Sequence, residues 1–127
     1  MKNTSSFCLL FAFALCFCIG CGGNSKNDNG TKQNETTNSN ELLEGKNLIT
    51  QSDCLGCHKE DDKLVGPSYV EVANYYEANE ENIKMLADKI VKGGQGSWGK
   101  VPMAPHPAIS EQDAQKMTKY ILSLKNR

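Results

Sequence analysis

The sequence predicts a single all-α domain. Apolar residues recur at helical spacing in four segments, three of these segments have a recognisable N-terminal cap, and no segment alternates apolar and polar residues as a half-buried strand would. The chain has 127 residues, which is enough for one domain. We therefore expect about four helices around one core.

Residues 1–20 have the pattern of a bacterial lipoprotein signal peptide. Lys2 supplies a positive start, and the apolar run from Phe7 to Ile19 has about the length of a signal-peptide core, too short to span a bilayer comfortably. Gly20 is a small residue before Cys21, which in such a signal becomes the lipidated first residue of the mature protein. The alternative is an ordinary cleavable signal with a chance Cys. We expect an exported protein whose lipid anchor on Cys21 holds it to a membrane, with the domain in the periplasm.

Residues 21–40 are expected to be the lipidated Cys followed by a disordered tether. No large apolar residue occurs from Gly22 to Asn40, where Asn, Gly, Thr and Ser dominate. Such a segment cannot bury enough surface to offset the entropy that it loses on ordering. The folded domain is then expected to cover residues 41–127.

The first helix is expected from Glu41 to about Gln51, where it leads into a cysteine motif. The apolar face of this helix is formed by Leu42, Leu43, Leu48 and Ile49.

The pentapeptide Cys54-Leu55-Gly56-Cys57-His58 has the C-x-x-C-H form that attaches c-type haem. The two thiols can each add to one vinyl group of the same porphyrin, and the adjacent imidazole can then ligate the iron. A thioredoxin-like redox pair would need a preceding strand, and a zinc site needs four ligands, for which only His106 is otherwise available in type. We therefore predict one covalent haem c.

The other cysteines are accounted for by export. Of the six in the chain, three lie in the signal peptide and Cys21 would be acylated, so that only the two haem thiols remain. No disulfide is expected, although an oxidising compartment would allow one.

Two further helices follow. The sequence Ser68-Tyr69-Val70-Glu71 has capping-box spacing and is expected to open a helix that continues to about Glu77. Asn79 can cap the next helix, and Gly93 suits its C-terminal stop. The apolar residues of this third helix fall at i, i+3, i+4 and i+7: Ile83, Leu86, Ala87 and Ile90.

The segment from Gly93 to Ile109 contains four Gly and three of the four Pro of the chain, and we expect it to lack secondary structure. A loop this long is uncommon in a compact domain unless it is functional, and covering one face of a haem would explain it. Met103 lies in this loop and is the candidate for the second iron ligand. A thioether ligand raises the reduction potential relative to a harder donor. Ser110 can cap the last helix, which is expected to continue to near Lys125.

Three segments, together with the pentapeptide, resemble class I cytochromes c, and most closely the small bacterial cytochrome c551/c552 group. They are Val65-Gly66-Pro67-Ser68-Tyr69, Gly94-Gln95-Gly96-Ser97-Trp98-Gly99 and Val101-Pro102-Met103-Ala104-Pro105. The resemblance covers about Glu41 to Lys125. It implies the class I cytochrome c fold, in which about four helices wrap around one covalently attached haem.

The resemblance also implies residue roles. Cys54 and Cys57 would form the thioethers, with His58 as the proximal and Met103 as the distal ligand. The backbone carbonyl of Pro67 would accept a hydrogen bond from His58 Nδ1–H, which fixes the imidazole. The indole N–H of Trp98 would reach a haem propionate.

Two positions depart from the relatives. Lys89 stands where they often place an Arg near a propionate. His106 stands where some have an Asn close to the Met sulfur, so that it could alter the hydrogen bond of Met103. Ligation by His58 and His106 is the alternative to ligation by His58 and Met103.

The resemblance implies a carrier of single electrons between a respiratory donor and a respiratory acceptor protein, rather than an enzyme. The alternatives are a haem subunit permanently docked in a larger respiratory enzyme and, with an open sixth site, a haem-based enzyme or sensor. The 14 basic and 15 acidic residues are too balanced to suggest nucleic acid, and no small-molecule substrate is expected. Four lysines are candidates to surround the haem edge and steer an acidic partner: Lys59, Lys63, Lys92 and Lys100.

Overall fold

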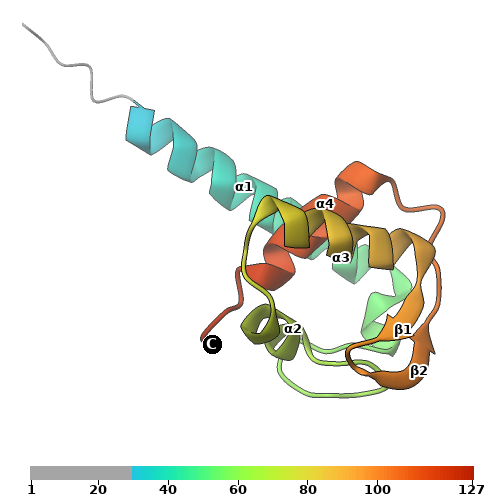
Figure 1. Cartoon of the computed structure of the whole chain (residues 1–127). Coiled ribbons are helices and arrows are strands. Elements are labelled where there is room, and N and C mark those ends of the chain that lie inside the picture. Colours follow the sequence, from blue (N-terminus) through green and yellow to red (C-terminus); the bar gives the residue numbers. More distant parts are fainter. Residues whose placement is uncertain (1–29) are drawn as a thin grey trace, which may run out of the picture.

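Four α-helices, one 3₁₀ turn and a short hairpin make up residues 30–127, the part of the chain that the computed structural model describes (Figure 1). The expected signal peptide, Cys21 and the first part of the expected tether lie outside the described residues. Within 30–127, no helix is both long enough and apolar enough to cross a membrane. The described fold is mostly helical, and the predicted all-α class is confirmed.

The first helix, α1 (Gly30–Gln51), begins well before the expected start at Glu41. The second part of the segment expected to be a disordered tether is therefore helical. Extending an existing helix adds one hydrogen bond for each residue fixed, whereas starting one is unfavourable. The packed half of α1 supplies the start, and residues 30–40 contain no Pro to stop the extension. Residues 36–40 are exposed.

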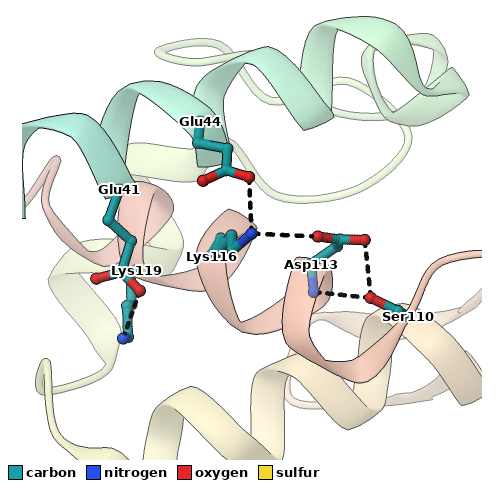
Figure 2. A network of polar contacts seen from close by, with 6 residues as sticks. All are labelled: Glu41, Glu44, Ser110, Asp113, Lys116 and Lys119. Atoms are coloured by element: carbon teal, nitrogen blue, oxygen red, sulfur yellow. Dashed lines mark hydrogen bonds and ion pairs between the residues drawn. The ribbon is translucent and has the colours of Figure 1, made fainter.

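Helix α1 packs against the last helix, α4 (Glu111–Leu122), and the two approach closely at Gly45. A Cβ atom at Gly45 would overlap the backbone oxygen of Lys116. Ion pairs flank this crossing, as Figure 2 shows: Glu44 lies 2.7 Å from Lys116, and Glu41 lies 2.8 Å from Lys119. Direct backbone contact and paired charges therefore fix α1 on α4.

A 3₁₀ turn, η1 (Asp53–Gly56), follows α1 and carries the first part of the cysteine motif. Helix α2 (Tyr69–Tyr75) then begins at the predicted capping box, in which Ser68 and Glu71 each accept a hydrogen bond from the other's backbone N–H. The helix ends at Tyr75, two residues before the expected Glu77.

Helix α3 (Glu80–Lys92) has the predicted boundaries. The side chain of Asn79 accepts a hydrogen bond from Asn82 N–H, and Gly93 ends the helix with a φ of 71°, a conformation that favours glycine. Helix α4 likewise begins after its predicted cap, Ser110, whose hydroxyl accepts from Asp113 N–H (Figure 2). It ends at Leu122, before the expected Lys125.

The buried core lies where α4 contacts α1, α2 and α3. Its members are Ile49, Tyr69, Ala73, Ala87, Ile90, Ala114, Met117, Tyr120 and Leu124. These positions include Ala87 and Ile90, two of the four apolar residues predicted from helical spacing in the third helix.

The segment between α3 and α4 contains secondary structure, so the expectation that it would have none is wrong. It holds an antiparallel hairpin of β1 (Gly94–Gly96) and β2 (Gly99–Met103), which lies at the opposite end of the molecule from the start of α1 (Figure 1). Both strands are mostly exposed, so no alternation of apolar and polar residues marks them. The glycines that suggested a loop adopt positive φ angles in the hairpin.

Candidate functional site

A cavity of about 540 Å³ lies between α2, α3, α4, the hairpin and the segment after η1. All six residues expected to contact a haem line it: Cys54, Cys57, His58, Pro67, Trp98 and Met103. They come from segments that are far apart in the sequence, and the fold brings them around one space. The role of each residue toward a haem stays a prediction, which the contacts of that residue support or weaken.

The two thiols lie in and just after η1. Backbone N–H groups of Cys57 and His58 both donate to the carbonyl of Cys54, at 3.2 and 3.0 Å, and so close a tight turn. Cys54 is half-buried and Cys57 is exposed, and neither forms a disulfide within the described residues. Burial, with a smaller contribution from the Asp53 carboxylate, raises the pKa of the Cys54 thiol. Burial of Cys54 therefore favours its thiol over its thiolate.

The imidazole of His58 has a defined tautomer. Its Nδ1 lies 2.7 Å from the backbone oxygen of Pro67. A carbonyl oxygen can only accept, so Nδ1 carries the proton and Nε2 keeps its lone pair. This is the contact that the resemblance implied for Pro67, and it leaves Nε2 able to ligate a metal.

Two neighbours pack against the same imidazole. A Cβ atom at Gly66 would overlap His58 Cε1, so only a glycine fits there. The ring of Tyr69 stacks on the imidazole, with centroids 5.7 Å apart and planes 15° from parallel. The imidazole is therefore restricted by a hydrogen bond and by close packing.

Met103 is the last residue of β2 and is half-buried in the cavity wall. The backbone beside it rests on the end of α3, because a Cβ atom at Gly93 would lie 2.5 Å from the Met103 oxygen and 2.8 Å from the Pro105 nitrogen. The hairpin and the end of α3 thus place a thioether in the cavity that also holds His58.

His106 is not among the residues that line the cavity. Its Nδ1 lies 3.2 Å from the backbone oxygen of Ile90, and its Nε2 lies 3.2 Å from an Asp53 carboxylate oxygen. Among the described residues, no hydrogen bond joins His106 to the Met103 sulfur, and both ring nitrogens of His106 face these other oxygens. Ligation by His106 would require both contacts to break.

The cavity fits a covalently attached haem. It offers two thiols, an imidazole nitrogen and a thioether sulfur, which are the donors that a c-type haem uses. Lys89 and Trp98 add N–H donors to the wall, as propionates require. The hydroxyl of Tyr69 is buried at the wall and has no hydrogen-bond partner within residues 30–127. In that same part of the chain, no group of three His, Cys, Asp or Glu residues could hold a metal ion.

Sequence reasoning missed two contributors to the site. Gly66 and Tyr69 were noted only as parts of a resembling segment, yet both contact His58. Both residues lie within two positions of Pro67, and this could have identified them. The Pro67 carbonyl accepts a hydrogen bond from His58, so residues beside Pro67 must lie close to the imidazole.

The chain is similar to known proteins in both sequence and fold. The cytochrome c family model matches residues 42–125. Cytochrome c-552 of Hydrogenobacter thermophilus is 41% identical over 78 residues, which is 61% of this chain and 79% of that protein. Cytochrome c-551 of Azotobacter vinelandii is 41% identical over 81 residues, which is 64% of this chain and 98% of that protein.

The fold is also similar to a solved structure. The crystal structure of wild-type Nitrosomonas europaea cytochrome c552 superposes with a TM-score of 0.59 at 35% sequence identity. The match covers 62% of this chain and 98% of that one. The part of this chain outside the match therefore has no counterpart in that structure.

Proposed function

This chain belongs to the cytochrome c family, whose members carry a covalently attached haem c, and from this premise we propose that it transfers single electrons with His58 and Met103 as the axial ligands. The observation that carries the proposal is the shared cavity. One space is lined by both thiols, by the imidazole and by the thioether.

The residues of the chain set the conditions for transfer. When bound, haem supplies an iron that exchanges one electron between its Fe(II) and Fe(III) states. His58 presents Nε2 because its Nδ1–H donates to the Pro67 carbonyl oxygen, which lies 2.7 Å from Nδ1. A hydrogen bond of this kind raises the basicity of the imidazole, whereas the softer thioether of Met103 favours Fe(II) and raises the potential.

Both axial positions are filled by the protein in this proposal. Gly66 and Tyr69 restrict His58, and the end of α3 supports the backbone of Met103. No substrate then binds at the iron in either oxidation state, so the protein acts as a carrier rather than as an enzyme. Trp98 and Lys89, which also line the cavity, are proposed to donate to the haem propionates.

Lysines at the cavity suit an acidic redox partner. Lys63, Lys89 and Lys100 are exposed, line the cavity and form no ion pair within residues 30–127. The expected set of lysines is revised accordingly, because Lys59 and Lys92 do not line the cavity and Lys92 pairs with Asp88 at 2.7 Å. We propose respiratory donor and acceptor proteins whose acidic surfaces these lysines attract.

We propose that this carrier lies in the periplasm and is tethered to a membrane. The pattern of residues 1–20, followed by Cys21, supports export and a lipid anchor. The anchor would keep the domain near a membrane that also holds its partners.

A visible spectrum of the mature protein tests the axial ligands. We expect low-spin c-type spectra with the weak long-wavelength band of Met-ligated Fe(III), and loss of that band in Met103→Ala. Met117→Leu is the matched control, because Met117 also lines the cavity but belongs to the core of α4. It should keep the band.

Two other spectra would contradict the proposal. A low-spin spectrum without the band would indicate His106 as the second ligand. A high-spin spectrum would indicate an open site and an enzyme or sensor.

A further inference from the structure

We propose that His106 is a positioning residue for Met103, acting as a side-chain link between the segment that follows β2, the end of α3 and the haem-attachment turn. The proposal rests on the proposed function, because it concerns how firmly Met103 is held as an iron ligand. Three groups of contacts carry it.

The first contacts join His106 to the last turn of α3. Its backbone N–H donates to the carbonyls of Ile90 and Val91, at 3.2 and 3.1 Å, and its Nδ1 lies 3.2 Å from the same Ile90 oxygen. The last carbonyls of a helix lack partners within the helix. His106 therefore satisfies groups that α3 leaves open and is fixed by them in return.

The second contact joins His106 to the turn that carries the cysteines. Its Nε2 lies 3.2 Å from Asp53 Oδ1, and Asp53 immediately precedes Cys54. The His106 side chain is only 18% exposed, whereas that of Asp53 is 82% exposed. The imidazole is thus held in place between a helix end and an outer carboxylate, and both of its nitrogens face oxygen acceptors.

The third contact shows why Met103 depends on this link. Only Ala104 and Pro105 separate Met103 from His106, and Pro105 has a fixed φ. The backbone from Met103 to Pro105 lies against Gly93. Ile109 N–H donates to the His106 carbonyl at 3.0 Å and closes the next turn. The short segment that bears Met103 therefore has a fixed point directly after it.

Competition by free imidazole measures how firmly Met103 is held. Imidazole can bind the ferric iron only when Met103 has left it, so the apparent dissociation constant falls as the open fraction rises. For His106→Ala, which loses two side-chain contacts, we expect imidazole to bind about tenfold more tightly. For Asp53→Ala, which removes one of these contacts, we expect imidazole to bind about threefold more tightly, within the range of one hydrogen bond.

A double variant tests whether the two residues act together. If Asp53 acts through His106, the double variant should bind imidazole no more than about twofold more tightly than His106→Ala alone, because effects within one contact network do not add. The band of Met-ligated Fe(III) should weaken in the same order as imidazole affinity rises.

Reduction potentials separate this role from a simple charge effect. Removing a negative charge near the haem raises the potential, because the carboxylate favours Fe(III). Loss of the Met103 ligand from Fe(III) instead lowers it. Asp62→Ala removes an exposed carboxylate that forms no ion pair within residues 30–127. We expect a lower potential in Asp53→Ala than in this control.

Glu44→Ala is the control for general destabilisation, since it removes an ion pair between α1 and α4 (Figure 2). It should leave imidazole affinity unchanged. Wild-type affinity in both His106→Ala and Asp53→Ala would overturn this proposal while leaving the proposed function intact. Absence of the Met band in the wild-type protein would instead overturn the proposed function. Asp53→Ala keeps the test decisive if His106→Ala does not fold.

Discussion

At the scale of single residues, the orientation of His58 depends on three neighbours that follow it closely in sequence. The Pro67 carbonyl accepts a hydrogen bond from Nδ1–H, Gly66 leaves room for the ring, and Tyr69 stacks on it. A hydrogen bond fixes the direction of the ring, whereas packing fixes its plane. The function of the ligand therefore depends on residues that never touch the metal.

Gly66→Ala should disturb His58 directly. The added methyl would overlap the imidazole, so the ring or the Gly66-Pro67 backbone must move and the bond to Pro67 must weaken. We expect a loss of about 1–3 kcal/mol in the free energy of unfolding, the usual range for overpacking. Urea denaturation and the ferric spectrum of the holoprotein would measure both effects.

Gly56→Ala is the matched control for this change. A Cβ atom at Gly56 would meet nothing within 4 Å, although Gly56 lies between the two haem cysteines. It should leave the ferric spectrum unaltered. Equal effects of the two substitutions would contradict the claim that contact with the imidazole is the cause.

Tyr120 should make stability depend on pH in the alkaline range. Burial, with the hydrogen bond that its hydroxyl donates to Glu60, raises the pKa of Tyr120 from 10.0 to about 12. The folded state thus keeps its proton where the unfolded state loses it. The resulting stabilisation is fully present below pH 10 and is lost as pH rises toward 12.

The substitution Tyr120→Phe should remove this pH dependence. Between pH 10 and 12, we expect the free energy of unfolding of the wild-type protein to fall by about 2 kcal/mol more than that of the variant. Chemical denaturation at a series of pH values would measure the two slopes. Parallel slopes would show that Tyr120 does not contribute.

At the scale of elements, the close approach of α1 and α4 depends on one position in a helix. Gly45 is buried, and its missing side chain allows the backbone of Lys116 to lie directly against it. In an isolated helix, replacing Gly by Ala is stabilising by about 1 kcal/mol. Here contact with a neighbouring helix outweighs that preference.

Gly45→Ala should therefore destabilise the protein, by about 1–3 kcal/mol, because the methyl would overlap the Lys116 oxygen and press on Tyr120. Asn47→Ala lies two residues away on the exposed side of α1 and should be neutral or slightly stabilising. Thermal unfolding of the two variants would give opposite shifts in Tm. A gain in Tm for Gly45→Ala would show that α1 moves away from α4 without loss.

The elements differ in how far the sequence could predict them. The starts of α2, α3 and α4 were predicted because each begins with a local signal: the capping residues Ser68, Asn79 and Ser110. The start of α1 was not, because a helix extended from a packed segment needs no cap of its own. The hairpin was missed because its glycines and exposed residues follow no strand pattern.

The residues of the candidate site also differ in how far the sequence could predict them. The cysteine motif and Met103 could be identified from sequence and from the family resemblance. The contact between His106 and Asp53 could not, since the two residues are 53 positions apart in the sequence and only the fold brings His106 Nε2 to 3.2 Å from the Asp53 carboxylate. The direction of the His106 ring depends on the end of α3, which no local pattern describes.

At the scale of the whole molecule, the core is built around the cavity. Buried residues of the core, including Ile49, Tyr69, Ile90 and Met117, also line the space of about 540 Å³. If that space is left without its haem, these side chains lose contacts on one side, and a domain of this size has little other apolar surface to bury.

Protein without haem should therefore lack a cooperative fold. The double variant Cys54→Ala, Cys57→Ala, produced without haem, should show weak near-UV circular dichroism and a broad thermal transition. The holoprotein measured alongside it should unfold sharply. Sharp, cooperative unfolding of the haem-free variant would show that the helices and their ion pairs are enough for a cooperative fold without haem.

Helix α1 also decides how the molecule would be oriented on a membrane. Its first part projects beyond the other helices and points away from the hairpin (Figure 1). A helix advances about 1.5 Å for each residue and resists bending, unlike a flexible chain of the same length. If the N-terminus is held at a membrane, α1 would act as a rigid stalk that keeps the hairpin, and the cavity beside it, away from the bilayer surface.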